Sequence, residues 1–369
     1  MDDRALLSQR SPLRIRPAVA RVPGYKPGKP APPVPGLVSY KLSSNENPFP
    51  PLPGVLEATT QAVAQMNRYP DMANTAMTAA LSERLGVDPD RLAFGAGSVA
   101  VLYHLLQATC EAGDEVIYAW RSFEAYPIAV LITGATPVPV PLGPGAVHDL
   151  DAIRAAITPA TKVIMLCTPN NPTGPALRHD EVRALVDAVP EHIMIVIDEA
   201  YAEFVTDPHR VRGLELAADR ANVAVLRTFS KAYGLAGFRV GFCVAAPELA
   251  AAVRAVALPF GVSVPAQAAV VASLAAEPAL LERVAVLVQA RDAVEASLRE
   301  IGFAVPDTQA NFVWLPAGPR TAEYATAFGA AGLMVRPYAV GEPGDGVRIT
   351  IGEPEANARM LEVAATLPR

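Results

Sequence analysis

The sequence has few of the residues that bind metals or form disulfides. Its 369 residues include three cysteines and five histidines. The cysteines, Cys110, Cys167 and Cys243, are far apart and form no CxxC pair, and the histidines share no ligand spacing. These absences argue against a metal site and against a disulfide framework. They are typical of a protein in a reducing cytoplasm.

Charge is also scarce, and no long apolar run is present. Charged residues make up 18% of the chain, the net charge is −6, and no block of like charge occurs, so nucleic acid is not an expected partner. No apolar run approaches the ~18 residues that a membrane span needs. The first thirty residues lack the apolar stretch of a signal peptide. With 51% hydrophobic residues, the chain should instead be a soluble protein of about two domains.

Proline is concentrated near the beginning, where "VPGYKPGKPAPPVPGLV" carries six. This composition excludes helix and interior strand there, and it predicts an extended arm over residues 1–45 that belongs to the smaller domain. From residue 46 to residue 276, helical runs alternate with short apolar runs such as "TKVIMLC" and "HIMIVIDEAY". This alternation predicts a large α/β domain with a mostly parallel sheet between helices.

The pattern of apolar and polar residues changes after residue 276. The stretch "PALLERVAVLVQARDAVEASLREIG" has the pattern of one long amphipathic helix that ends at Gly302. Short strands in "NFVWLP", "GLMVRPY" and "GVRITIG" then interleave with two further predicted helices, over residues 321–330 and 354–367. We therefore expect a smaller α+β domain over residues 277–369.

One apolar, glycine-rich stretch, "LRTFSKAYGLAGFRVGFCV", contains Lys231 and Arg239. A buried lysine must be neutralised, paired or covalently used. The stretch could therefore be a phosphate loop, a structural ion pair, or a lysine that carries a cofactor. A P-loop is excluded because GxxxxGK[ST] is absent. Thr228, Ser230 and Arg239 would supply the hydroxyls and the cation that a cofactor phosphate requires.

Two further motifs follow apolar strands, at the positions where ligands collect in open α/β sheets. In "LCTPNNPTG", Asn171 could bind a ligand or satisfy the backbone of an ordinary loop. In "IVIDEAYAEF", Asp198 and Tyr201 stand at the end of a strand that is apolar on both faces. The carboxylate of Asp198 there could pair with an arginine, cap a helix, or face a protonated ring nitrogen.

A fourth motif, "LAFGAGSVAVLYHLLQATC", allows two interpretations. Gly95, Gly97 and Ala100 satisfy GxGxxA, and Glu115 follows twenty residues after Gly95, as in the dinucleotide-binding fingerprint. That fingerprint does not explain Lys231. A glycine-lined helix N-terminus also suits a phosphate monoester, with the backbone N–H groups of Gly97 and Ser98 as donors.

Taken together and in this order, "YKLSSNENPFP", "NRYPD", "GAGS", "PNNPTG", "DEAY", "TFSKAYGLAGFRVGF", "ANFVWL" and "VRITIG" resemble the class I/II pyridoxal-phosphate aminotransferases. Within that family the chain is similar to the histidinol-phosphate aminotransferase subgroup. It looks most like the aromatic amino acid, or phenylalanine, aminotransferases of that subgroup. The resemblance implies the fold of aspartate aminotransferase, and it extends from residue 40 to residue 352.

The resemblance also implies roles for individual residues. Lys231 would hold pyridoxal 5′-phosphate as a Schiff base and move the substrate proton. Asp198 would keep the ring nitrogen protonated, and Tyr201 and Asn171 would hydrogen-bond the ring oxygen. Phe123, in "RSFEAYP", would stack on the ring or else pack in the core. The phosphate cup would consist of Gly97, Ser98, Thr228, Ser230 and Arg239.

The remaining implied residues concern the substrate and a partner subunit. Arg348 would bind the substrate α-carboxylate bidentately. Arg336 would bind a substrate phosphate or the distal carboxylate of glutamate, or would pair with an acid between the domains. Asn47 would contact substrate, although a structural role is at least as plausible for it and for Asn311. Tyr69 would reach the cofactor phosphate of the partner subunit, which makes the expected enzyme a homodimer.

The sequence therefore predicts a cytoplasmic, homodimeric aminotransferase that moves the amino group of an aromatic L-amino acid to 2-oxoglutarate. Transamination of histidinol phosphate is the first alternative. An NAD-dependent oxidoreductase and a catalytically silent binding module are alternatives from other classes. No metal, nucleic acid or membrane is expected to take part.

Overall fold

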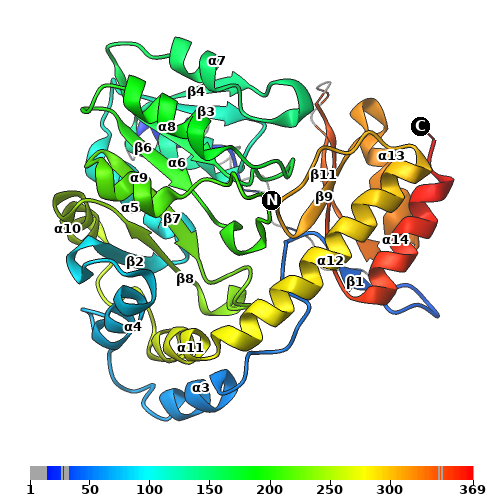
Figure 1. The fold of residues 1–369 in the computed structure, drawn as a ribbon, viewed down its shortest axis with the longest axis horizontal. Coiled ribbons are helices and arrows are strands. Elements are labelled where there is room, and N and C mark those ends of the chain that lie inside the picture. The colour runs from blue at the N-terminus through cyan, green and yellow to red at the C-terminus, as the bar shows by residue number, and fades with distance from the viewer. Residues whose placement is uncertain (1–14, 26–27, 29–32, 340, 342–343, 369) are drawn as a thin grey trace.

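The computed structural model describes residues 15–25, 28, 33–339, 341 and 344–368 (Figure 1). Part of the predicted arm lies outside these residues. Within the described part, the arm contains a short helix, α2 (Pro17–Arg21), which begins with proline at its first turn and packs against α6 (Ala125–Thr133). Proline suits that position because its missing N–H would have no partner there. The sequence had suggested an extended arm over residues 1–45. The structure differs, because this part of the arm is helical.

The larger part of the molecule is built on a seven-stranded sheet with the order β2-β8-β7-β6-β5-β3-β4. The strands are β2 (Leu92–Ala96), β8 (Val240–Val244), β7 (Val223–Thr228), β6 (Met194–Asp198), β5 (Thr161–Cys167), β3 (Glu115–Trp120) and β4 (Thr136–Pro141). β8 runs antiparallel to both of its neighbours, and the strands from β7 to β4 are parallel. The predicted mostly parallel sheet is confirmed.

Helices cover both faces of this sheet and bury two apolar cores. Alternate strand residues point to opposite faces, so Val116 and Tyr118 of β3 enter one core while Ile117 and Ala119 enter the other. The first core is closed by α6 together with α5 (Ser98–Thr109) and α10 (Pro247–Val256). The second is closed by α7 (Leu150–Ala155), α8 (His179–Ala188) and α9 (Gly213–Asp219).

The strand order excludes the dinucleotide-binding alternative for the GAGS motif. In that fingerprint the strand, its helix and an adjacent parallel strand form one unit. Here β2 lies at the sheet edge beside antiparallel β8, and β3, which begins at Glu115, lies at the other side of the sheet. The glycines of GAGS therefore mark a turn into α5 and not a βαβ dinucleotide site.

The C-terminal part forms a second, smaller unit. The predicted long helix is α12 (Glu277–Ile301), which ends at Gly302 in the left-handed conformation that favours glycine. The sheet of this unit has three antiparallel strands, whose spatial order is β11 (Arg336–Tyr338), β12 (Gly346–Thr350), β9 (Phe312–Pro316). Helices α13 (Thr321–Ala330) and α14 (Pro354–Thr366) cover this sheet. The arm joins this unit through β1 (Tyr40–Lys41), which pairs in parallel with β10 (Leu333–Met334).

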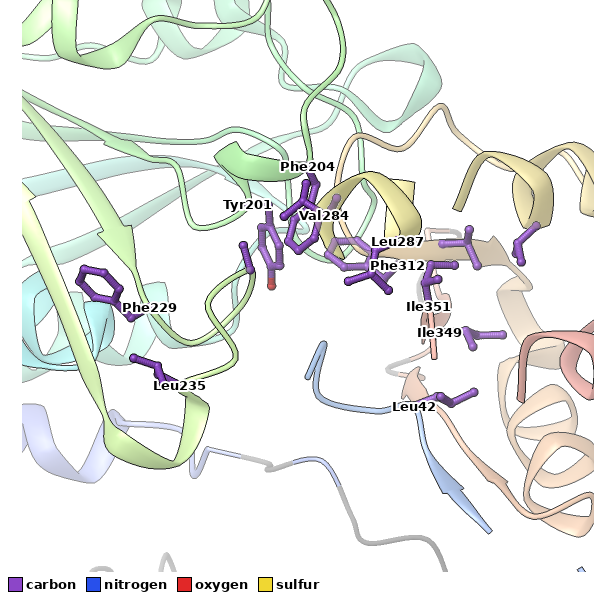
Figure 2. Close-up of a cluster of buried hydrophobic side chains, with 14 of the residues drawn as sticks. Leu42, Tyr201, Phe204, Phe229, Leu235, Val284, Leu287, Phe312, Ile349 and Ile351 are labelled. Atoms are coloured by element: carbon purple, nitrogen blue, oxygen red, sulfur yellow. The ribbon is translucent and has the colours of Figure 1, made fainter. Parts of the chain in front are cut away.

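A third apolar core connects the two units. It runs from Phe229, at the end of β7, through Tyr201 and Phe312 to Ile349 on β12, with α12 packed across it (Figure 2). Helices α3 (Val55–Val63), α4 (Thr75–Leu85) and α11 (Val264–Ala275), at the lower left of Figure 1, also contribute buried side chains to this core. A continuous core of this kind sets the position of the small sheet relative to the lysine loop. The domain limits at residues 45 and 276 stay predictions.

No helix in the described part of the chain is long and apolar enough to cross a membrane.

Candidate active site

A cavity of about 260 Å³ lies at the carboxyl ends of the central parallel strands. Cys167 at the end of β5, Asp198 at the end of β6 and Thr228 at the end of β7 all line it. The "SSNE" segment, residues 43–46, and the small sheet close the other side. Parallel strands end at one edge of a sheet, so motifs far apart in the sequence meet there.

The amine of Lys231 projects into this cavity. Its Nζ donates a hydrogen bond to the Ser44 carbonyl at 3.0 Å and lies 5.8 Å from the ring centre of Tyr201. Burial, reinforced by the positive charge of Arg348, lowers the pKa of Lys231 to about 7. A large fraction of these amines is therefore neutral at neutral pH, and a neutral amine can act as a nucleophile and as a base.

The carboxylate of Asp198 is buried opposite the lysine loop. Tyr126 donates its hydroxyl to Oδ2 at 2.7 Å, and the backbone N–H of Ala200 donates to Oδ1 at 3.2 Å. Burial nevertheless raises the pKa of Asp198 to about 6, because desolvation outweighs the two hydrogen bonds that favour the ionised form. A cation that bound beside this carboxylate would be stabilised by it.

Tyr201 and Asn171 each hydrogen-bond a different cavity residue. Asn45 donates its side-chain amide to the Tyr201 hydroxyl at 2.9 Å. Arg348 donates to Asn171 Oδ1 at 2.6 Å and to the carbonyl of Ser43 at 2.7 Å. The buried Nε of Arg348 has no hydrogen-bond acceptor among the described residues. A buried donor without an acceptor costs about 1–3 kcal/mol, so a carboxylate at this guanidinium would be stabilising.

The residues of the predicted phosphate cup come together at the start of α5. Ser98, Thr228, Ser230 and Arg239 line the cavity. Arg239 has a positive φ of 55° and donates to Ser230 Oγ at 3.3 Å. Gly97 has a φ of +82°, and a Cβ added to it would lie 2.3 Å from Arg239 Nη2, so a larger residue there would strain the backbone and displace the guanidinium. A helix N-terminus, hydroxyls and an arginine together suit a phosphate monoester.

Phe123 also lines the cavity, and its ring packs edge-on against Tyr126 at 5.7 Å. Arg336 forms an ion pair with Glu124 and stands opposite Arg348 in the β11–β12 register. Of the three roles that the sequence left open for Arg336, the structure thus contains the pairing with an acid of the large unit.

Three residues singled out in the sequence lie away from the cavity lining. Asn47 donates its amide to the carbonyl of Ala232 at 2.8 Å, so it supports the backbone of the lysine loop, and its expected contact with substrate stays a prediction. Asn311 donates to the Asn45 carbonyl at 3.3 Å, which is a structural role. Tyr69 is 82% exposed and stacks on Phe260 with 4.7 Å between ring centres.

Sequence reasoning missed several cavity residues. Asn45 stands two positions before Asn47 in the same motif, and only the fold reveals which of the two faces Tyr201. Glu124, which lines the cavity, and Tyr126, which donates to Asp198, both follow Phe123 in "RSFEAYP", so the motif pointed to the right segment. Tyr338 lines the cavity beside Arg336, and its ring gave no distinct signal in the sequence.

Comparisons with known proteins agree with this geometry. The family model "Aminotransferase class I and II" matches residues 39–363. The chain is 57% identical to an aromatic amino acid aminotransferase of Streptomyces avermitilis over 97% of this chain and 98% of that protein. It also resembles the structure of a histidinol-phosphate aminotransferase from Sinorhizobium meliloti in complex with pyridoxal 5′-phosphate, at 30% identity and a TM-score of 0.82 over 89% of this chain and 91% of that one.

A tetra mutant of Thermus thermophilus aspartate aminotransferase gives a TM-score of 0.78 at 26% identity, over 88% of this chain and 95% of that chain. The expected aspartate aminotransferase-like fold is confirmed. One cavity contains the lysine, the buried carboxylate and the arginine, and the surrounding fold and the family match agree with this arrangement. This chain therefore belongs to the class I and II aminotransferases.

Proposed function

We propose that the protein transfers the amino group of an aromatic L-amino acid to 2-oxoglutarate, with pyridoxal 5′-phosphate as its cofactor. The observation that carries this proposal is the meeting of Lys231, Asp198 and Arg348 at one cavity. The 57% identity to an aromatic amino acid aminotransferase over nearly the whole chain supports the substrate class.

The residues present fit the cofactor. Arg239, Ser230 and Thr228 would hold its phosphate with the N-terminus of α5, and Asp198 would hold its ring nitrogen. Phe123 would lie against the ring face. When bound, pyridoxal 5′-phosphate supplies an electron-poor ring that stabilises negative charge at the substrate Cα.

The chain's own groups then have distinct tasks. Lys231 Nζ, with its pKa near 7, would attach the cofactor and later take the proton from the substrate Cα. Arg348 would bind the substrate α-carboxylate through donors such as its unpartnered Nε. Asn171 uses its Oδ1 to accept from Arg348, so its Nδ2 is the group left to donate to the cofactor's ring oxygen together with Tyr201.

The lining of the cavity favours an aromatic side chain. Tyr25, Phe123 and Tyr338 line it near the ion pair of Arg336 with Glu124. Because Glu124 neutralises Arg336, that end of the cavity is better suited to an aromatic ring than to a second phosphate. Histidinol-phosphate transamination remains the second candidate, supported by the likeness to the Sinorhizobium meliloti enzyme.

Steady-state kinetics with purified holoenzyme tests the proposal. With 2-oxoglutarate as acceptor, kcat/KM should be larger for phenylalanine or tyrosine than for histidinol phosphate. Lys231→Ala should remove turnover and also the borohydride-sensitive visible absorbance of the lysine-bound cofactor. A large preference for histidinol phosphate would replace the substrate assignment, and near wild-type turnover by Lys231→Ala would overturn the mechanism.

We also propose that the active unit is a homodimer to which each subunit contributes Tyr69. Exposed apolar side chains cluster in two neighbouring segments, and they are Leu56, Val63, Met66, Tyr69, Met72, Val256, Leu258 and Phe260. A hollow of about 780 Å³ lies beside them, lined in part by Met72, Leu258 and Phe260. An apolar surface of this kind is typical of an interface between subunits.

Mixed dimers test the shared site. Lys231→Ala chains keep Tyr69 and Tyr69→Phe chains keep Lys231, so a hybrid dimer would contain one complete site. Random mixing should therefore restore about a quarter of the wild-type sites. Activity that equals the average of the two parent variants would show that Tyr69 acts within its own subunit or not at all.

We further assign the enzyme to the cytoplasm, in keeping with three free, buried cysteines.

A further inference from the structure

Asn45 lines the cavity, but the proposed function gives it no task. It is 1% exposed, and its φ of 53° lies in the left-handed region that few residues other than glycine and asparagine adopt. Its backbone N–H donates to Thr350 Oγ1 at 2.9 Å, and its carbonyl accepts from Asn311 at 3.3 Å. Residues that their surroundings hold in this conformation cluster at functional sites. The small unit thus fixes the position of Asn45 in the cavity wall.

The side-chain amide of Asn45 connects the small sheet to Tyr201. Its Nδ2 donates to the Tyr201 hydroxyl at 2.9 Å, and its Oδ1 accepts from Thr350 Oγ1 on β12 at 3.1 Å. Tyr201 is 3% exposed, and its ring packs edge-on against Phe312 with 5.3 Å between ring centres (Figure 2). Within the described part of the chain, the hydroxyl has no hydrogen-bond partner besides Asn45. The position of the phenol is therefore set by packing, and the direction of its hydrogen bond is set by Asn45.

The direction of this hydrogen bond decides what the hydroxyl of Tyr201 can do. Burial raises the pKa of Tyr201, so the hydroxyl keeps its single proton at neutral pH. An amide N–H cannot accept that proton, so the proton stays available for an acceptor in the cavity. A hydroxyl that accepts a hydrogen bond also becomes a stronger donor. Lys231 Nζ lies 5.8 Å from the ring centre of Tyr201, so a cofactor attached to this lysine would bring its ring oxygen close to the hydroxyl.

We propose that Asn45 is a positioning residue that makes the Tyr201 hydroxyl donate its proton to the ring oxygen of the cofactor. The amide of Asn45 occupies the phenolic oxygen as a donor, and the hydroxyl then donates toward the cavity. A donor at the negatively charged ring oxygen weakens the hold of that oxygen on the proton of the lysine–cofactor linkage, so the linkage loses its proton at a lower pH. Asn45 acts through Tyr201 and contacts neither substrate nor cofactor. The inference rests on the proposed function, because it gives Asn45 a task in the same site.

Absorbance titration of the holoenzyme measures this effect without turnover. The visible absorbance of the lysine-bound cofactor changes with pH, and the midpoint of the change reports the proton of the linkage. Asn45→Asp keeps the size of the side chain and replaces the donor by an acceptor, so Tyr201 should turn its proton away from the cofactor and the midpoint should rise by about one pH unit. Asn45→Gly keeps the left-handed backbone and removes the amide, so the midpoint should rise by about half a pH unit.

The Tyr201→Phe background separates the orientation of the hydroxyl from the added charge. Without the hydroxyl, Asn45→Gly should leave the midpoint within about 0.2 pH units, and Asn45→Asp should show only the smaller part that is due to its charge. Asn222→Asp makes the same replacement at an amide that donates to the Ile193 carbonyl, beside the starts of β6 and β7, and the midpoint should not move. No shift in either Asn45 variant, or equal shifts with and without the Tyr201 hydroxyl, would overturn the proposal.

The wild-type enzyme separates this inference from the function beneath it. A wild type that shows no borohydride-sensitive visible absorbance with pyridoxal 5′-phosphate, and no amino transfer from aromatic amino acids to 2-oxoglutarate, refutes the proposed function. A wild type that shows both, combined with a midpoint that does not depend on Asn45 through Tyr201, refutes the positioning role alone.

Discussion

Replacement of Lys231 by methionine should stabilise the cofactor-free protein at neutral pH. The ordinary pKa of lysine is 10.5, and burial together with Arg348 lowers that of Lys231 to about 7. The unfolded chain therefore binds a proton here that the folded protein holds only in part. Such a group lowers stability at every pH below its unfolded pKa, and stability rises with pH wherever the unfolded state binds more protons. Methionine has a similar length and carries no charge, so it removes this cost.

The size of the effect follows from the two pKa values. At pH 7, a shift from 10.5 to about 7 corresponds to roughly 4 kcal/mol against folding. Water in the cavity screens part of this cost, and methionine forfeits the hydrogen bond to the Ser44 carbonyl, which contributes about 1 kcal/mol. A net gain of about 2 kcal/mol remains. For a chain of this length, that gain should raise the Tm by about 2–3 °C.

The pH dependence of the stability difference tests whether the buried charge is its cause. The cost of the buried amine is complete below about pH 7, falls as pH rises, and vanishes above the unfolded pKa of 10.5. Thermal unfolding of cofactor-free wild type and Lys231→Met should thus differ at pH 7 and converge near pH 10.5. Lys162→Met, at a half-buried lysine of β5, measures the generic effect of the substitution. An equal difference at both pH values, or no gain at pH 7, would refute the desolvation argument.

Three more predictions concern the cavity. Tyr126→Phe removes the hydroxyl that favours ionised Asp198, so the acidic limb of kcat/KM should move to higher pH, and an unchanged profile would contradict this role. Gly97→Ala places a methyl group 2.3 Å from Arg239 Nη2, so the Kd of pyridoxal 5′-phosphate should rise at least about tenfold. Absorbance titration measures this Kd, and the circular dichroism spectrum of the variant should stay native. Arg348→Lys loses the planar bidentate binding of the substrate α-carboxylate. The kcat/KM for the aromatic amino acid and for 2-oxoglutarate should therefore both fall by about a hundredfold, a result that a purely structural arginine would not give.

Much of the architecture could be predicted because it depends on local pattern. The long helix and the two C-terminal helices begin and end within a residue or so of their predicted limits, since apolar periodicity and a terminal glycine or proline determine them. The convergence of the lysine, DEAY and PNNPTG motifs was also predictable, because each follows a parallel strand and such strands end at one edge. The GAGS motif was ambiguous, because its meaning depends on the direction of a neighbouring strand.

By itself, then, the sequence determined the element types, the family and the segments that meet at the cavity. Tertiary structure alone decided which side chain in each segment does what. Asn45 faces Tyr201 while Asn47 turns to the lysine loop, and Glu124 reaches Arg336 from 212 positions away. The lowered pKa of Lys231 likewise arises only when distant segments exclude water around it. Partners and desolvation are set by packing between remote parts of the chain, which no local periodicity encodes.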